Sequence, residues 1–197
     1  MDIEKYKSIQ RWSSDLDGIF TISDLKVALD ENSEATLYRT VAEMIRSDVL
    51  IRVKKGVYAT PEAKLTDIST RIEPEAYIST ATVLAKYGII GSIPARRVQA
   101  VKIGRARTYG CKLGVIEHLS INPRLYFGFS TIDGRLTASP EKAFLDVCYF
   151  CFKGRRFSFD PESDINLENF DFDIIEDYLE QYDTKFISFF SRIWRKP

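Results

Sequence analysis

The 197-residue chain is poor in the residues that most often build metal sites and disulfide frameworks, since it has three cysteines and one histidine, His118. An odd and small number of thiols fits a reducing compartment better than a disulfide scaffold. Cys148 and Cys151 have the spacing of half a zinc site, but the sequence offers no second pair. We expect free thiols that pack in the core, no metal and no cofactor.

Signatures of catalysis are equally scarce. A single histidine weakens any Ser–His or Cys–His mechanism, and His118 lies in a strand-like run where a structural role fits better. Neither a P-loop nor a dinucleotide-binding fingerprint occurs. We expect a protein that is not an enzyme and has no catalytic residue.

Long hydrophobic runs are also missing. The longest, Val147 to Phe152, is far too short to span a bilayer. The first residues, MDIEKYK, are charged and lack the apolar region of a signal peptide. These features predict a soluble, cytoplasmic protein.

Charge is balanced in total, with 28 basic and 28 acidic residues, but it is uneven along the chain. Residues 1–60 carry 9 Lys+Arg against 10 Asp+Glu, residues 61–157 carry 15 against 8, and residues 158–197 carry 4 against 10. A basic middle favours a polyanionic or acidic partner. The acidic end is either a solvated face or a mate for that basic middle.

The first sixty residues follow the order helix, helix, helix, hairpin. Apolar residues recur at helical spacing from Tyr6 to Leu16, from Leu25 to Leu29 and from Leu37 to Ile45. The stretch LIRVKKGVYA then gives two short strand-like runs joined at Gly56, which suits the positive φ of a tight turn. This order predicts a winged helix-turn-helix.

The face of the third helix opposite its apolar stripe carries small hydroxyls and arginine, which suit close approach to base edges in a DNA major groove. Basic residues at the hairpin would contact phosphates without reading sequence. A protein-docking helix-turn-helix, with lysines that only protect a strand edge, is the alternative. The predicted DNA-binding residues are Ser33, Thr36, Tyr38, Arg39, Thr40, Arg46, Arg52, Lys54 and Lys55.

A second domain is expected after a polar linker at 61–73, within which a helical turn is the alternative. Ser79 is predicted to cap a short helix that ends at Gly88. Several β-rich runs follow, and Asp133-Gly134 marks a two-residue hairpin turn. Ser139 and Pro140 then start a buried helix, with Ser as N-cap and Pro in the first turn. The predicted fold class is α+β, with an antiparallel sheet and C-terminal helices after the winged helix.

Four strings along this layout, KKGVYATP, AYISTATVLAKYGIIGSIP, RVQAVKI and ASPEKAFLDVCY, resemble the AbiEi-type antitoxins of type IV toxin–antitoxin systems. The resemblance covers about residues 10–153. It implies a winged helix that represses its own operon at inverted repeats in double-stranded DNA. It also implies a C-terminal domain that counteracts a nucleotidyltransferase-like toxin, not necessarily by stable contact.

On this resemblance, the working face of the second domain would be a basic stretch. The alternative is that these arginines have no function, and are only solvated or paired with carboxylates. The predicted residues of this face are Arg96, Arg97, Lys102, Arg105 and Arg107.

The last forty residues depart from the family pattern, because they are acidic and aromatic. Ile174, Ile175, Tyr178 and Leu179 have helical spacing, as do the apolar residues from Phe186 to Ile193. The predicted organisation is therefore a winged helix at 1–60, a linker at 61–73, an α+β domain at 74–157 and a helical segment at 158–197 packed on that domain. Docking of the acidic segment on the basic stretch remains the alternative.

Overall fold

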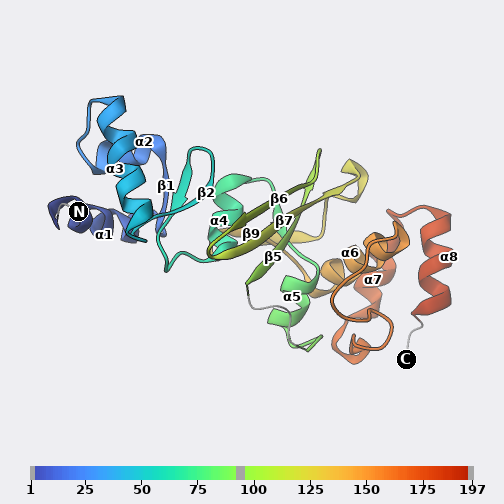
Figure 1. The fold of residues 1–197 in the computed structure, drawn as a ribbon. Coiled ribbons are helices and arrows are strands. Elements are labelled where there is room, and N and C mark those ends of the chain that lie inside the picture. Colours follow the sequence, from blue (N-terminus) through green and yellow to red (C-terminus); the bar gives the residue numbers. More distant parts are fainter. Residues whose placement is uncertain (1–2, 92–95, 195–197) are drawn as a thin grey trace. The chain divides into compact units, whose positions relative to one another are not determined.

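The structure is a computed structural model that describes residues 3–91 and 96–194. It is an α+β protein with one antiparallel and one mixed sheet and with helices at its C-terminal end (Figure 1). The chain divides into two compact units. The first unit comprises residues 1–73 and 108–116, and the second comprises residues 74–107 and 117–197.

The first unit begins with helices and a small sheet whose ends are set by local chemistry. Thr21 and Asp24 form a reciprocal capping box at the start of the second helix. Ser33 caps the third helix by accepting from the Thr36 N–H. Gly56, at φ +78°, completes the predicted tight turn. The elements are α1 (Ile3–Asp15), β1 (Ile19–Thr21), α2 (Ile22–Ala28), α3 (Glu34–Arg46), β2 (Ile51–Lys54), β3 (Val57–Ala59) and α4 (Leu65–Ile72).

The three strands form an antiparallel sheet in the order β1-β3-β2. One core, which includes Phe20 and Tyr58, joins this sheet to α1, α2 and α3. A second core contains Val53, Val57 and Ile68 together with Ile116 from a distant part of the chain. Because successive strand residues alternate between faces, both faces of the small sheet are covered.

The segment 61–73 is not the linker that its polar sequence predicts. It contains α4, in which Ile68 and Ser69 have no exposed surface. Ile68 belongs to the second core of the first unit. Three apolar residues of this short helix, Leu65, Ile68 and Ile72, pack against the sheet, which supplies the surface that they cover.

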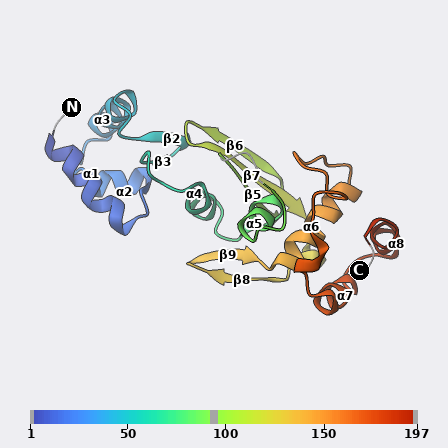
Figure 2. The ribbon, with the colours of Figure 1, turned by 90° about the horizontal axis from the view of Figure 1, so that it is seen from below.

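The second unit is built on a six-stranded sheet with the order β6-β7-β5-β4-β9-β8 (Figure 2). Its β4–β9 pairing is parallel, whereas β4–β5 and β8–β9 are antiparallel. Residues 108–116, which include all of β6 except Arg107 as well as the start of β7, count with the first unit. The strands are β4 (Tyr77–Ile78), β5 (Arg97–Ile103), β6 (Arg107–Cys111), β7 (Gly114–Ile121), β8 (Phe129–Ile132) and β9 (Arg135–Ala138).

The helices of the second unit gather around one buried helix. Its Ser139 N-cap, which accepts from the Lys142 N–H, and its Pro140 are as predicted. The predicted Asp133-Gly134 turn is confirmed as well, because both residues have positive φ and the pair joins β8 to β9. The helices are α5 (Ala81–Lys86), α6 (Pro140–Phe152), α7 (Phe172–Leu179) and α8 (Thr184–Ile193), with short 3-10 turns at Pro123–Leu125 and Leu167–Asn169.

Aromatic packing joins the acidic C-terminal segment to α6 within the second unit. Phe144 stacks on Phe170 with ring centroids 4.6 Å apart, and it meets Phe190 and Trp194 edge to face. Phe186 lies between Tyr149 and Tyr182 at 5.8 and 4.5 Å. The segment is therefore a packed helical layer as far as residue 194, and residues 195–197 lie outside the described part.

One predicted helix cap is wrong. Ser79 is fully buried and donates to Asp146 Oδ2 at 2.7 Å, and Thr80, at φ +51°, precedes α5 without a side-chain cap. A buried carboxylate offers Ser79 a stronger partner than a helix N–H does. Within the described parts of the chain, no helix has the length and hydrophobicity needed to cross a membrane.

Candidate functional site

Helix α3 presents a polar face of the first unit. Leu37, Val41 and Met44 are buried in the helical core, which fixes the rotation of the helix. Arg39 and Arg46 are exposed, and so is Ser33 at the cap. Tyr38 is 49% exposed although it is a large aromatic residue. Thr36 is half-buried, and its hydroxyl donates to Ser33 Oγ at 3.2 Å.

Thr40 is not on this face, contrary to the sequence-based prediction. It is only 8% exposed, and its Oγ1 accepts from Lys5 Nζ on α1 at 3.4 Å. Thr40 lies next to Val41, and the neighbouring α1 covers the side of α3 on which it sits. Its hydroxyl ties two helices together and is not available to a partner.

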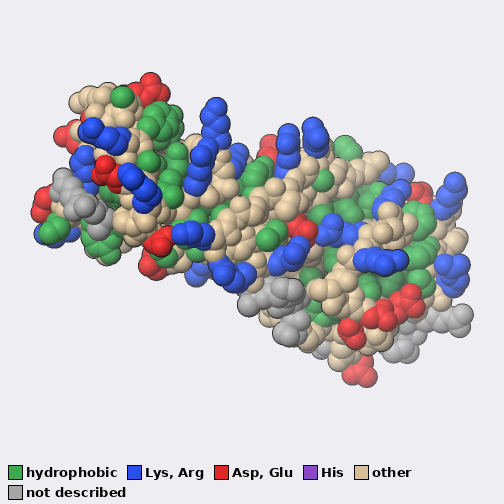
Figure 3. All heavy atoms as spheres, in the orientation of Figure 1, with side chains coloured by type: hydrophobic (Ala, Val, Ile, Leu, Met, Phe, Trp, Pro, Cys, Tyr) green, Lys and Arg blue, Asp and Glu red, His purple; other side chains and the backbone are tan. Residues whose placement is uncertain are grey.

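The β2–β3 hairpin carries the other predicted basic residues of this unit. Arg52 and Lys55 are exposed, whereas Lys54 is half-buried, with its ammonium 5.7 Å from the centroid of the Tyr109 ring. Lys and Arg side chains project from the surface over the tip of this hairpin (Figure 3). Lys55 is therefore the free cation of the tip, while Lys54 is partly held by an aromatic ring.

The Tyr58 hydroxyl is influenced by charged and polar groups of both α3 and β2. Burial raises the pKa of the Tyr58 hydroxyl, the charge of Arg52 lowers it, and Tyr38 raises it further. These influences place Arg52 from β2 and Tyr38 from α3 close to the same hydroxyl. One residue of α3 and one of β2 thus both act on the hydroxyl of Tyr58 in β3.

Residues 108–116, which are distant in sequence, pack against the β2–β3 hairpin. Tyr109, Cys111 and Leu113 pack against the core that contains Val53 and Val57. Lys112 forms an ion pair with Asp48, which follows α3. The hairpin is thus packed against the helices through one core and against residues 108–116 through the other.

The basic stretch predicted in the second unit does not act as one patch. Arg97 opens β5 and pairs with Glu117 on β7, with Nη1 to Oε1 at 2.9 Å. Lys102 is half-buried near the other end of β5, and Arg105 and Arg107 are exposed beyond it. Arg96 is exposed just before β5. The strand therefore separates Arg96 and Arg97 from the remaining three.

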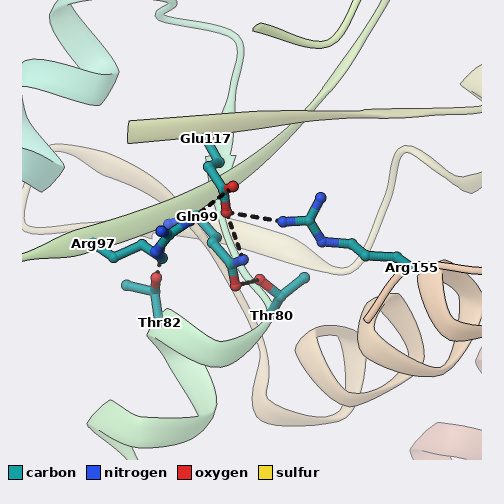
Figure 4. A network of polar contacts seen from close by, with 6 residues as sticks. All are labelled: Thr80, Thr82, Arg97, Gln99, Glu117 and Arg155. Atoms are coloured by element: carbon teal, nitrogen blue, oxygen red, sulfur yellow. Dashed lines mark hydrogen bonds and ion pairs between the residues drawn. The ribbon is translucent and has the colours of Figure 1, made fainter. Parts of the chain in front are cut away.

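Arg97 belongs instead to a polar network that the sequence did not predict (Figure 4). Glu117 Oε2 accepts from Arg155 Nη2 at 2.9 Å and from Gln99 Nε2 at 2.8 Å. Gln99 Oε1 in turn accepts from the Thr80 hydroxyl at 2.7 Å. Burial alone would raise the pKa of Glu117, but the Gln99 hydrogen bond and the charges of Arg155 and Arg97 lower it overall. Glu117 is thus held as a carboxylate.

A second network joins β4 to α6 through polar side chains that have no exposed surface. Lys142 and Asp146, one helical turn apart on α6, form an ion pair with no exposed surface. Asp146 Oδ2 also accepts from Tyr77 at 3.0 Å, and the Lys142 ammonium lies 4.8 Å from the Phe127 ring centroid. Burial, followed by the Asp146 charge, raises the pKa of Tyr77 well above its usual 10.0. The Ser-Pro-Glu-Lys-Ala string at 139–143 is thereby explained by structure.

The cysteines of α6 have the environment of core residues. Cys148 is completely buried, and this burial raises the pKa of its thiol well above 9.0. Burial and the nearby Glu162 and Asp160 raise the pKa of Cys151 to about 11. Thiols with such pKa values are poor nucleophiles at neutral pH. No cluster of three or more potential metal ligands occurs in the described ranges.

Sequence reasoning missed Glu117, Gln99 and Arg155, which make up most of the network around Arg97. A single glutamate and glutamine inside strand-like runs give no local signal. The Arg155-Arg156 pair after Gly154 was visible as charge, but only tertiary structure brings it to β5 and β7.

Comparison with known proteins adds information on the fold. No protein-family profile matches the chain, and no curated protein sequence matches it. The crystal structure of the RV2827C protein from Mycobacterium tuberculosis is similar, with a TM-score of 0.65 and 15% sequence identity. The similarity covers 98% of this chain and 77% of that chain. At this identity the likeness concerns the fold, and it extends over both units described above.

Proposed function

We propose that the first unit binds double-stranded DNA as a winged helix-turn-helix, with α3 in the major groove and the β2–β3 hairpin as the wing. The observation that carries the proposal is that α3 and the β2–β3 hairpin bury their apolar sides in the two cores and leave Tyr38, Arg39, Arg52 and Lys55 exposed. Arg39 is suited to bidentate contact with guanine. Arg52 and Lys55 are suited to phosphate contacts that position the unit.

The resemblance to AbiEi-type antitoxins, which covers about residues 10–153, extends this proposal beyond the first unit. The protein would be a cytoplasmic transcriptional repressor of its own operon, and its second unit would serve the counteraction of a nucleotidyltransferase-like toxin. Neither role requires a catalytic residue, a metal or a cofactor in this chain. Binding to inverted repeats would bring two copies together on one operator.

A titration with DNA tests the central proposal. Labelled duplex from the region upstream of the gene and a scrambled duplex are each titrated by fluorescence anisotropy at two salt concentrations. We expect tighter binding to the natural duplex and a loss of affinity as salt rises, because phosphate contacts release counterions. Equal and feeble binding to both duplexes would remove the DNA proposal and leave protein docking, which the exposed Tyr38 and Val27 would then serve.

Single substitutions distinguish residues that would contact bases from residues that would contact phosphates. Arg39→Ala should cost about 1–3 kcal/mol on the natural site and relax the preference at one base pair. Lys55→Ala should weaken binding to both duplexes alike and reduce the salt dependence. Lys54→Ala should cost less than Lys55→Ala, because Lys54 is half-buried over Tyr109.

The control variant is Lys185→Ala, which removes an exposed charge from α8. It should leave both affinities unchanged. Equal losses on natural and scrambled DNA from Arg39→Ala and Lys55→Ala would contradict the assignment of α3 as the reading helix.

A further inference from the structure

The polar network around Glu117 borders a small open cavity in the second unit. Its volume is about 140 Å³. It lies between the start of α5, strands β5 and β7, and the segment 155–158 that follows α6. The lining residues with ionic or hydroxyl side chains are Thr82, Arg97, Glu117, Arg155, Arg156 and Ser158.

The charges around this cavity do not cancel. Three arginines, Arg97, Arg155 and Arg156, meet a single carboxylate, Glu117. Glu117 is already engaged through both oxygens, by Arg97 and by Arg155 and Gln99. Its lowered pKa keeps it ionised, so it neutralises one guanidinium and the cavity retains an excess positive charge.

Two of the residues that line the cavity also have hydrogen-bond donors that are not used within the described parts of the chain. The Arg155 Nε–H is buried and has no hydrogen-bond partner among the described residues. An unsatisfied buried donor is costly, and it is commonly explained by a ligand or water that completes it. Thr82 Oγ1 accepts from the Gln99 N–H at 2.8 Å, which leaves the Thr82 hydroxyl hydrogen available to an acceptor.

We propose that this cavity binds a phosphate group, supplied either as inorganic phosphate or as the phosphate of a nucleoside monophosphate. Planar guanidinium groups with several N–H donors match phosphate oxygens better than any other side chain does. Cavities that enclose whole drug-sized ligands measure about 300–1,000 Å³, so this one takes a single small group while the rest of the ligand lies outside. Phe157, whose ring centroid lies 5.5 Å from the Arg155 guanidinium carbon, also lines the cavity and offers a ring on which a base would stack.

The network has a defined part in this site. Glu117 orients Arg97 and Arg155 toward one another, and without it their charges would repel. The Thr80–Gln99–Glu117 chain of hydrogen bonds fixes that carboxylate in turn. Glu117, Gln99 and Thr80 are therefore positioning residues, whereas Arg97, Arg155, Arg156 and Thr82 would contact the phosphate. This site is independent of DNA binding by the first unit.

Calorimetry on the full chain tests the proposal with three probes at constant ionic strength: inorganic phosphate, AMP and acetate. We expect one phosphate or AMP per chain and at least about tenfold weaker binding of acetate, which accepts fewer hydrogen bonds. Tighter binding of AMP than of phosphate would show that the nucleoside adds contacts, and equal binding that the phosphate suffices. Acetate binding as tightly as phosphate, or no saturable binding of either phosphate compound up to about 10 mM, would overturn the proposal.

A matched pair of variants locates the site. Arg155→Lys keeps the charge but removes the Nε–H and the planar fork, so AMP affinity should fall about tenfold. Arg105→Lys makes the same change on an exposed residue beyond the far end of β5 and should leave the affinity unchanged. Equal losses in both variants would overturn the assignment.

A spectroscopic measurement on the unmodified chain covers the case in which Arg155→Lys fails to fold. In ¹⁵N-labelled protein, the Arg155 Nε–H resonance should shift saturably with added phosphate, while that of Arg105 should not. A resonance of Arg155 that stays unmoved while phosphate binds elsewhere would contradict the proposed site.

Discussion

At the scale of single residues, the second unit is unusual for the charge pair that it keeps entirely away from water. Lys142 is saturated by Asp146, the Tyr182 hydroxyl at 3.3 Å and the Phe127 ring. Asp146 is saturated by Lys142, Tyr77 and Ser79. A buried pair of this kind is weak evidence for net stability, but the loss of one partner leaves an uncompensated charge in the core.

Asp146→Ala should therefore destabilise the protein by about 3–5 kcal/mol. The measurement is the free energy of unfolding from urea denaturation. The double variant Lys142→Met/Asp146→Leu, which removes both charges, should recover at least half of the loss. Asp177→Ala, which removes an exposed carboxylate from α7, is the control and should change little. A cost below about 1 kcal/mol for Asp146→Ala would show that water reaches Lys142 after the substitution.

Turns and helix starts that depend on neighbouring residues were the features most readily predicted from the sequence. Gly56, Asp133-Gly134 and Ser139-Pro140 act through their own backbone or side chain within a few residues, so their roles were readable from sequence. Ser79 and Thr40 were misjudged because each has a partner far along the chain, in Asp146 and Lys5. Hydroxyl groups serve caps, cores and partners equally well, and only tertiary structure decides among these uses.

At the scale of elements, α2 is a seven-residue helix that depends on its first turn. Thr21 Oγ1 accepts from the Asp24 N–H at 3.2 Å, and Asp24 Oδ2 accepts from the Thr21 N–H at 2.8 Å. Burial raises the pKa of Asp24, but hydrogen bonds from Thr21 and Arg71 lower it overall. Asp24 also accepts from Arg71 of α4 at 2.9 Å, so one carboxylate joins two helices.

Thr21→Ala should cost about 1 kcal/mol, because it removes the side-chain half of the capping box. Thr21→Ser keeps the hydroxyl and is the matched control, with a smaller loss expected. Urea denaturation of the full chain measures both. The capping role would be contradicted by equal losses in the serine and alanine variants.

The elements that sequence could not place were those stabilised from a distance. Residues 61–73 have a polar composition typical of a linker, and α4 forms there only because the small sheet accepts Leu65 and Ile68. Residues 108–116 showed a strand-like pattern, but nothing in their sequence indicated that their apolar side chains would pack against Val53 and Val57. The basic stretch was similarly divided by the length of β5, which only the sheet reveals.

At the scale of the whole molecule, the first unit is discontinuous in sequence, since it takes residues 108–116 from the middle of the chain. Ile116, which is 1% exposed, completes the core on the second face of the small sheet. The fragment 1–73 should therefore be less stable than the complete unit. It keeps the core formed by α1, α2 and α3 but leaves Val53, Val57 and Ile68 partly uncovered.

We expect the fragment 1–73 to melt less cooperatively and at lower temperature than the same fragment joined to residues 108–116 by a flexible Gly/Ser linker. Circular dichroism during heating measures the difference. The loss of one buried isoleucine alone is worth about 2–5 kcal/mol in comparable cores, so the shift should be several degrees. Identical melting of the two fragments would show that residues 108–116 are dispensable for the first unit.

The same discontinuity delays completion of the first unit during synthesis on the ribosome. The amino-terminal 73 residues leave the ribosome before the strands that finish their core, and 43 further residues, from 74 to 116, must follow. At about 5–20 residues per second, the wait lasts roughly 2 to 9 s. During that interval one side of a three-stranded sheet is only partly covered, by α4, so the nascent chain offers chaperones an apolar surface that the finished protein has closed.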